Sequence, residues 1–164
     1  MTRHPKPTRL LFVCYGNIIR SPLAESLFRQ LAAGAGLADK YLANSAGTSG
    51  LFDGVSPDPR ICRVAAAHGL ELDHRSRGVT PEDYGDFDVI LAMDTRNLAD
   101  LRAVAPSPSS RDRVRLLREF DPLGGPDASV PDPVRSGPEA FEATYAVIER
   151  SVRGLLEALE RMQR

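Results

Sequence analysis

The sequence predicts a single α/β domain, built on a four-stranded parallel sheet with helices on both faces. Short, fully apolar runs alternate with segments of helical periodicity, which is typical of such a sheet. The length of 164 residues suits one well-buried core. Apolar residues make up 42% and charged residues 26%, as in ordinary globular proteins. We expect one domain over residues 9–164, preceded by a flexible segment over residues 1–8.

The composition argues against several functional classes. A formal net charge of -1 gives no overall attraction to nucleic acid or to an anionic membrane. The basic segment MTRHPKPTR precedes LLFV, which is too short for a signal-peptide core or a membrane span. Cys14 and Cys62 are too few for a disulfide framework. We therefore expect a cytoplasmic protein that binds neither nucleic acid nor membranes.

The first strand and helix follow from the segment LLFVCYGNIIRSPLAESLF. Residues 10–14 form an apolar run that predicts a buried strand. A helix is expected from Ser21, whose side chain can cap it, to the glycines at positions 34 and 36. Glu25 and Arg29 are a favourable i,i+4 pair on this helix.

The remaining elements continue the alternation. Strands are predicted in KYLANSAGT, in DVILAM (residues 88–93) and in RVRLL, with helices in residues 60–69 and in DTRNLADLRAVA. Residues 118–138 are rich in Pro, Gly and Asp and predict a long loop. The segment PEAFEATYAVIERSVRGLLEALERM predicts a final amphipathic helix. Its expected buried stripe comprises Phe141, Tyr145, Ile148, Val152, Leu155, Leu156 and Leu159.

The topology indicates where a ligand would bind. Open parallel sheets bind ligands beyond the carboxyl ends of their strands, where the strand order reverses. Cys14 lies at such an end. A loop as long as residues 118–138 is usually functional, and it could cover the same edge.

The residues from Cys14 to Arg20 predict an anion-binding loop. Peptide N–H groups between a strand and a helix point toward a bound anion, and the helix dipole adds positive potential. Gly16 permits a positive φ angle, and Asn17 is among the few other residues that tolerate one. Arg20 can present a planar fork to two phosphate oxygens.

The same field favours the thiolate form of Cys14. A thiolate beneath a bound oxyanion can attack its central atom, and Ser21 can donate its hydroxyl to the sulfur when the sulfur leaves. The alternative is a small apolar cysteine that merely closes a strand. An arginine six positions later and a serine at the seventh, at a strand–turn–helix joint, argue against that interpretation.

The sequence resembles the low-molecular-weight protein tyrosine phosphatases over nearly its whole length. Cys14 and Arg20 match the C-x5-R signature of that family, and VCYGNIIRSP resembles its V-C-x-G-N-x-x-R-S-P form. The segments NSAGTSG, SPDPR, HRSR, FDVILAMD followed by NL, FDP and the late DP recur in family order. The resemblance implies a four-stranded parallel sheet flanked by helices, in agreement with the pattern.

The resemblance also implies roles for individual residues. Cys14 would be the nucleophile that forms a cysteinyl-phosphate, Arg20 the phosphate clamp and Asp132 the general acid and base. Asp-Pro also occurs at Asp58 and Asp121, so the residues alone leave the choice of acid open. The phosphate loop would comprise Cys14, Tyr15, Gly16, Asn17, Ile18, Ile19 and Arg20. A supporting hydrogen-bond network would comprise Asn17, Ser21, Ser45 and His74.

The implied activity is hydrolysis of a phosphorylated protein or small phosphomonoester, with inorganic phosphate as product and no cofactor or metal. The wall of the substrate cleft would comprise Tyr15, Leu51, Phe52, Val134 and Arg135. The family usually has aromatic residues at the positions of Leu51, Val134 and Arg135, so strict phosphotyrosine specificity is less firmly implied. Arg135 could favour an acidic flank of a phosphopeptide, or it could be a solvated surface charge.

Other departures leave two further functions open. The family commonly has a second cysteine in the loop where this chain has Ile19, and Cys62 is expected to pack in the core. Arsenate reduction uses the same loop but needs additional cysteines, and residues 75–100 contain none. A non-catalytic phosphate-binding regulator is the other alternative, although Cys14, Arg20 and Asp132 are all present.

Overall fold

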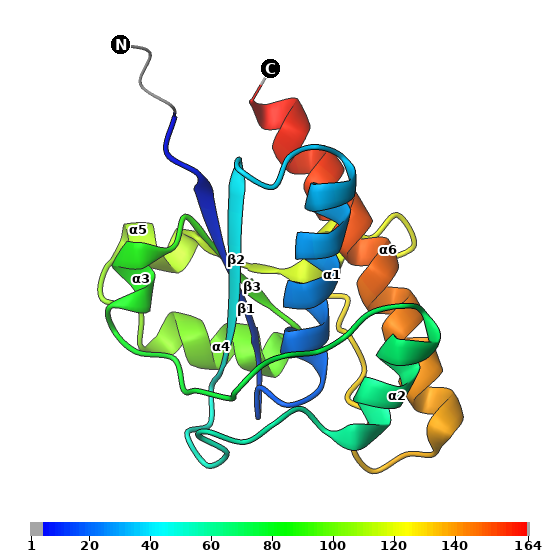
Figure 1. The fold of residues 1–164 in the computed structure, drawn as a ribbon. Coiled ribbons are helices and arrows are strands. Elements are labelled where there is room, and N and C mark those ends of the chain that lie inside the picture. Colours follow the sequence, from blue (N-terminus) through cyan, green and yellow to red (C-terminus); the bar gives the residue numbers. More distant parts are fainter. Residues whose placement is uncertain (1–4, 164) are drawn as a thin grey trace.

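The computed structural model describes residues 5–163, and the first part of the segment expected to be flexible, residues 1–4, lies outside this range. Its centre is a parallel sheet with the order β2-β1-β3-β4 (Figure 1). The strands are β1 Thr8–Cys14, β2 Tyr41–Gly47, β3 Val89–Ala92 and β4 Val114–Leu116. The predicted four-stranded parallel sheet is confirmed. β1 begins earlier than expected because Thr8 N donates to the carbonyl of Lys40 at 2.9 Å, next to β2.

Helices cover both faces of the sheet, as predicted. In Figure 1, α1 Arg20–Gly34, α2 Pro59–Ala67 and α6 Pro138–Met162 lie on one side of the sheet. The helices α3 Asp83–Asp86, α4 Thr95–Ala103 and α5 Pro108–Asp112 lie on the other. The short helices α3 and α5 were not predicted. Inside the expected long loop, the chain also forms a 3-10 turn, η1 Leu117–Phe120.

The alternation of side chains along β1 divides the core into two layers. Leu10 and Phe12 pack with the helices α1 and α6, whereas Leu11 and Val13 pack with Leu101 of α4. Because β1 lies between β2 and β3, its residues are buried on both faces, which explains the continuous apolar run. All seven residues of the stripe predicted on α6 are buried.

The start of α1 differs from the prediction. The N-cap is Ile19, and Ser21 lies inside the helix instead of capping it. The Ser21 hydroxyl is already engaged, because it lies 3.0 Å from the Cys14 sulfur. The Glu25–Arg29 pair is confirmed at 3.2 Å, but Glu25 is buried, and this burial raises its pKa.

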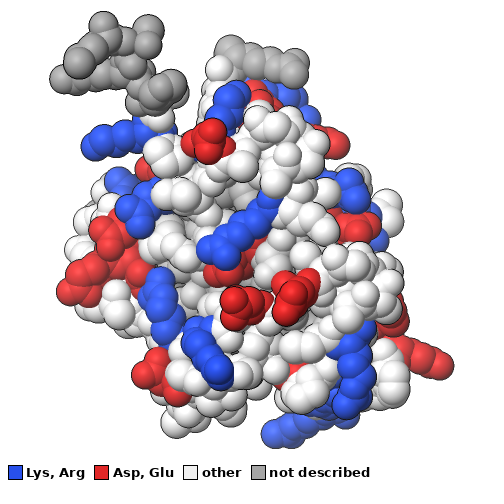
Figure 2. Space-filling model, in the orientation of Figure 1, with Lys and Arg blue, Asp and Glu red and all other residues white. Residues whose placement is uncertain are grey.

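The surface of the molecule carries charges of both signs. Figure 2 shows Lys and Arg interspersed with Asp and Glu over the face that α1 and β2 contribute to. Within residues 5–163, no helix combines the length and the apolar character needed to cross a bilayer.

The two neighbours of β1 place the functional edge. β2 and β3 flank β1, so Gly47 and Met93 lie beside the carboxyl end of β1, where Cys14 is the last residue. From β1 the chain moves to β2 on one side, and from β2 it crosses back over β1 to β3 on the other side. The carboxyl end of β1 is therefore the point where the strand order reverses. Cys14 therefore lies where this fold class binds ligands.

Candidate active site

The phosphate loop, residues 14–20, turns its carbonyls outward. The carbonyls of Cys14, Tyr15 and Ile18 accept hydrogen bonds from the peptide N–H groups of Thr48, Ser49 and Asp58, at 2.8–2.9 Å. Among residues 5–163, the N–H groups of Gly16, Ile18 and Ile19 have no hydrogen-bond acceptor. The loop is therefore fixed by its acceptors, and its donors remain available to an anion.

Two residues shape the backbone of this loop. Asn17 has φ of 57°, in the left-handed region that asparagine tolerates. Gly16 does not have a positive φ, so the expectation that its backbone freedom is needed there is wrong. Space limits Gly16 instead, since a Cβ there would lie 3.1 Å from the Phe52 ring. Gly47, the last residue of β2, lies beside the loop and is more tightly restricted than Gly16, because a Cβ at Gly47 would lie 2.6 Å from the carbonyl oxygen of Tyr15.

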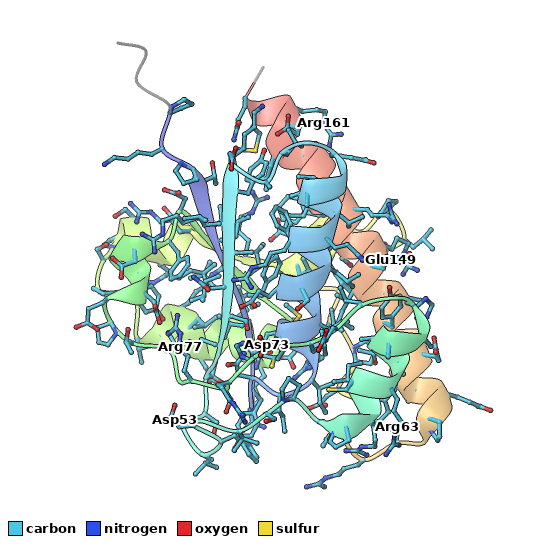
Figure 3. The ribbon with its side chains drawn as sticks, viewed as in Figure 1. Asp53, Arg63, Asp73, Arg77, Glu149 and Arg161 are labelled. Atoms are coloured by element: carbon cyan, nitrogen blue, oxygen red, sulfur yellow. The ribbon has the colours of Figure 1, made fainter. Side chains whose placement is uncertain are left out.

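The fully buried Asn17 side chain organises a network beneath the loop. Its amide nitrogen donates to Ser21 Oγ at 2.9 Å and to Ser45 Oγ at 3.0 Å. Its amide oxygen accepts from His74 Nε2 at 2.8 Å and from the peptide N–H of Arg77 at 3.0 Å. The structure thus brings together all four residues that the resemblance placed in the network. Figure 3 shows Arg77 on the segment between α2 and α3, a backbone partner that the sequence did not indicate.

The surroundings of His74 favour its neutral form. Burial lowers its pKa, and the nearby guanidinium groups of Arg29 and Arg77 lower it further. Its Nε2 must carry the proton to donate to Asn17. The side chain is half-buried, with Ser45 Oγ 3.4 Å from the same nitrogen.

Two donors point at the Cys14 sulfur. The peptide N–H of Asn17 donates to Sγ at 3.2 Å, and Ser21 Oγ lies 3.0 Å away. Ser21 Oγ already accepts from Asn17, so its own proton can point at the sulfur or at the more distant carbonyl of Ala46, 3.4 Å away. Cys14 is buried, with 3% exposure. This arrangement stabilises negative charge on the sulfur.

Arg20 is the first residue of α1, and its side chain is buried. Its Nη1 donates to Asp94 Oδ2 at 2.8 Å and to the carbonyl of Val130 at 3.0 Å, which fixes the guanidinium plane. Its Nη2 lies 3.5 Å from Asp132 Oδ2. The sequence alone did not single out Asp94 as a functional residue. Asp94 comes two residues after β3, the strand beside β1, and this position was the signal that could have identified it.

Asp132 reaches the same pocket from the long loop. The loop covers the edge of the sheet as expected, because Val130 N donates to the carbonyl of Met93 at 2.7 Å. The pocket is a cavity of about 230 Å³. Its lining residues are Cys14, Tyr15, Gly16, Ile18, Ile19, Arg20, Phe52, Asp132, Val134 and Arg135.

Four of the five residues expected on the cleft wall are in this lining. Leu51 is not: its side chain is 78% exposed and lies outside the pocket. The adjacent Phe52 ring takes this part of the wall, packed against Gly16. The wall therefore has two aromatic rings, those of Tyr15 and Phe52.

The second cysteine lies outside the pocket. Cys62 is half-buried on α2, so the expectation that it packs in the core is wrong. The helix turns Ile61, Val64 and Ala65 inward, which leaves Cys62 at the margin with its thiol 3.8 Å from the carbonyl of Pro57. Within residues 5–163, no three His, Cys, Asp or Glu side chains gather in a way that could hold a metal ion.

The fold and this site define a class: a parallel α/β domain with a cysteine and an arginine at the two ends of an amide-lined loop. The family model for low molecular weight phosphotyrosine protein phosphatase matches residues 9–164. The chain belongs to this family, as its sequence predicted.

Relatives and solved structures agree with this assignment. The chain is 42% identical to a low molecular weight protein-tyrosine-phosphatase of Streptomyces coelicolor, over 92% of this chain and 93% of the relative. It is 38% identical to the low molecular weight phosphotyrosine protein phosphatase of Sus scrofa, over 90% and 93%. A crystal structure of a protein tyrosine phosphatase from Entamoeba histolytica superposes with a TM-score of 0.90 at 32% identity. That match covers 96% of this chain and 99% of the other.

Proposed function

We propose that this chain hydrolyses phosphotyrosine in proteins, with Cys14 as the nucleophile, Arg20 as the phosphate clamp and Asp132 as the general acid and base. The observation that carries the proposal is the meeting of a hydrogen-bonded cysteine sulfur, free loop N–H groups, a fixed arginine and a carboxyl group in one cavity.

The first step transfers the phosphoryl group to sulfur. The Cys14 thiolate attacks phosphorus from below while the P–O bond to the leaving phenol breaks. The loop N–H groups and Arg20 stabilise the three equatorial oxygens in the transition state. Asp132 gives its proton to the departing oxygen, a role worth about 10²–10⁴-fold in rate. The products are a cysteinyl-phosphate and a neutral phenol.

The second step regenerates the enzyme. Asp132, now a carboxylate, takes a proton from a water molecule that attacks phosphorus on the face that the phenol has left. The P–S bond breaks, and inorganic phosphate leaves. Ser21 is placed to donate to the departing sulfur, 3.0 Å away. Each group thus returns to its starting protonation state.

The contacts of Arg20 support its role in both steps. Asp94 and the Val130 carbonyl engage Nη1, so the arginine is oriented before substrate arrives. Asp132 lies only 3.5 Å from Nη2, where phosphate oxygens would replace it. A preorganised guanidinium needs little reorganisation during the reaction, which is the main source of electrostatic catalysis.

Turnover of p-nitrophenyl phosphate by Cys14→Ser and Cys62→Ser variants tests the mechanism. We expect Cys14→Ser to lose about 10⁴-fold or more in kcat, because a serine hydroxyl is not ionised in this pocket. Cys62→Ser is the matched control and should keep its activity, since Cys62 does not line the cavity. Mass spectrometry of an acid-quenched reaction should find phosphate on Cys14. Full activity of Cys14→Ser would refute the cysteine mechanism.

Substrate class needs a separate test, because only Tyr15 and Phe52 supply aromatic walls. We propose that these two rings are sufficient for a phenyl group, and that the enzyme acts in the cytoplasm on phosphorylated proteins. A phosphate-release screen should rank phosphotyrosine peptides above phosphoserine peptides, phosphoarginine peptides and small phosphorylated metabolites. Substrates without an aromatic ring at the top of the ranking would contradict tyrosine specificity while leaving the phosphatase reaction intact.

A further inference from the structure

Arg60 lies near the start of α2 and does not line the cavity, yet it is connected to both loops that form it, directly to one and through Asp58 to the other. Asp58 caps α2 by accepting from Arg60 N at 2.9 Å. The same carboxylate accepts from Arg60 Nε at 3.1 Å and from Nη2 at 2.8 Å. These bonds from Arg60 lower the pKa of Asp58. The peptide N–H of Asp58 donates to the carbonyl of Ile18 at 2.8 Å, so this ion pair is attached to the phosphate loop.

The remaining guanidinium nitrogen of Arg60 reaches the segment that carries Asp132. Its Nη1 donates to the carbonyl of Val134 at 2.9 Å. The guanidinium carbon also lies 4.6 Å from the centre of the Phe141 ring, in the first turns of α6. Asp58 and Phe141 together fix the plane of the guanidinium, which in turn fixes the direction of the bond to Val134.

The acid loop, residues 131–137, has few other contacts that could hold it. The Asp132 carboxylate lies 3.5 Å from Arg20 Nη2, but phosphate oxygens would replace this ion pair when substrate binds. At its start, the carbonyl of Pro131 accepts from Thr144 Oγ1 at 3.3 Å. Within the loop, the bonds are local, from Val134 N to Asp132 Oδ1 and from Ser136 N to the carbonyl of Pro133. Among the residues that the structure describes, Arg60 thus supplies the hydrogen bond that connects residues 132–136 to another element.

We propose that Arg60 is a positioning residue that couples the two loops and holds Asp132 over the phosphate site. This inference rests on the proposed role of Asp132 as general acid. Arg60 binds the carbonyl two residues after Asp132, and through Asp58 it binds the loop whose Ile18 lines the same cavity. Loss of this link leaves the nucleophile and Arg20 in place but lets the acid loop move.

The consequence depends on the leaving group. A phenol of low pKa departs without a proton, whereas a phenol like that of tyrosine needs one. We expect Arg60→Met to lower kcat/KM for phenyl phosphate about tenfold more than for p-nitrophenyl phosphate. Arg60→Lys keeps a cation over Phe141 but cannot form the fork to Asp58 together with the bond to Val134, and should show an intermediate difference. Arg63→Met, at an exposed position on the same helix that Figure 3 labels, is the control and should change neither rate.

A double-mutant cycle separates this proposal from the function on which it rests. If Arg60 acts through Asp132, adding Arg60→Met to Asp132→Asn should change kcat/KM for phenyl phosphate by less than about twofold. Equal losses for both substrates, or an undiminished loss in the Asp132→Asn background, would overturn the positioning role. If Asp132→Asn itself shows no dependence on the leaving group, the assignment of the general acid fails and this inference fails with it. Thermal unfolding of each variant identifies losses caused by misfolding, and Arg60→Lys then provides the test.

Discussion

The two loops of the active site are held in different ways. Most of the phosphate loop is buried, with Asn17 at 0% and Arg20 at 2% exposure, although Tyr15 is 45% exposed. Its carbonyls accept hydrogen bonds from two other segments, residues 48–49 and Asp58. The acid loop lies at the surface, where the side chain of Asp132 is 41% exposed and Val134 is 40% exposed. One loop is part of the core, and the other is attached to it at a few points.

This difference matches the chemistry proposed for each loop. Charge develops on the phosphoryl oxygens at fixed positions, so their donors work best when they cannot move. A proton donor must give way while substrate enters and product leaves, so a segment with few contacts is suitable. We infer that stability is concentrated in the phosphate loop, and that the acid loop depends on particular tethers. The following changes test that comparison.

After Cys14→Ser, Arg20→Lys is expected to have the largest effect on activity, a loss of about 10²–10³-fold in kcat/KM. A single ammonium cannot bind both Asp94 and the Val130 carbonyl and still present two donors to phosphate. Steady-state kinetics with p-nitrophenyl phosphate measures the loss, and vanadate affinity should fall in parallel. A variant with unchanged vanadate affinity would show that the guanidinium geometry is not needed.

Asn17→Ala should cause the largest loss of stability, about 3 kcal/mol in the free energy of unfolding. The change leaves the N–H of Arg77 without its acceptor, removes the donor that Asn17 gives to Ser45 Oγ, and places alanine at a φ of 57°. Asn17→Gly removes the side chain without the backbone strain, so the difference between the two variants separates the two contributions. Urea unfolding measures both.

The matching substitution in the acid loop, Val134→Ala, should change the free energy of unfolding by less than about 0.5 kcal/mol. Its side chain is exposed, and Arg60 binds only its backbone carbonyl. If Val134→Ala were as destabilising as Asn17→Ala, the contrast between the two loops would be wrong.

Asp121 anchors the chain ahead of the acid loop, and its contribution to the stability of the fold should depend on pH. Burial alone would raise its pKa, but hydrogen bonds from Arg150, Leu123 N and Arg118 hold it at about 2, below the usual 3.8. A carboxyl group with a lowered pKa in the folded state stabilises the fold above its unfolded pKa, and this contribution is lost as pH falls from about 4 to about 2. The free energy of unfolding of the wild type should therefore exceed that of Asp121→Asn by about 2 kcal/mol at pH 7.

Urea unfolding at pH 7 and at pH 3 measures this difference, which should shrink at the lower pH. Activity of Asp121→Asn at pH 7 should stay within about twofold of wild type, because Asp121 does not line the cavity. A large loss of activity without a loss of stability would indicate that Asp121 also positions the acid loop.

The sequence predicted the phosphate loop better than the contacts around it, for a physical reason. Cys14 meets Asn17 and Ser21 within seven positions along the chain, so a local strand–turn–helix pattern contains most of their geometry. Arg20 meets Asp94, and Arg60 meets Val134, across separations of 74 residues each. Such pairings depend on the strand order and on the path of long loops, which periodicity does not encode. The same reasoning explains Ser21, whose local pattern suggested a helix cap while the tertiary structure turned its hydroxyl to Cys14.

Substitution of Arg135 should have only a small effect on activity, limited to substrates with acidic residues beside the phosphotyrosine. Arg135 lines the cavity from the exposed acid loop. An exposed pair between Arg135 and an acidic residue of a bound peptide would contribute about 0.2–1 kcal/mol and would weaken with salt. Arg135→Gln should therefore lower kcat/KM about two- to fivefold for phosphotyrosine peptides with flanking Glu or Asp, and leave peptides with neutral flanks unchanged. Arg111→Gln is the matched control, because Arg111 is an exposed residue of α5, on the side of the sheet opposite α2 and α6 (Figure 1). An equal loss for both peptide sets would mean that Arg135 acts on the phosphate or on the acid loop itself. The acid loop would then be less separate from the phosphate site than the comparison of the two loops implies.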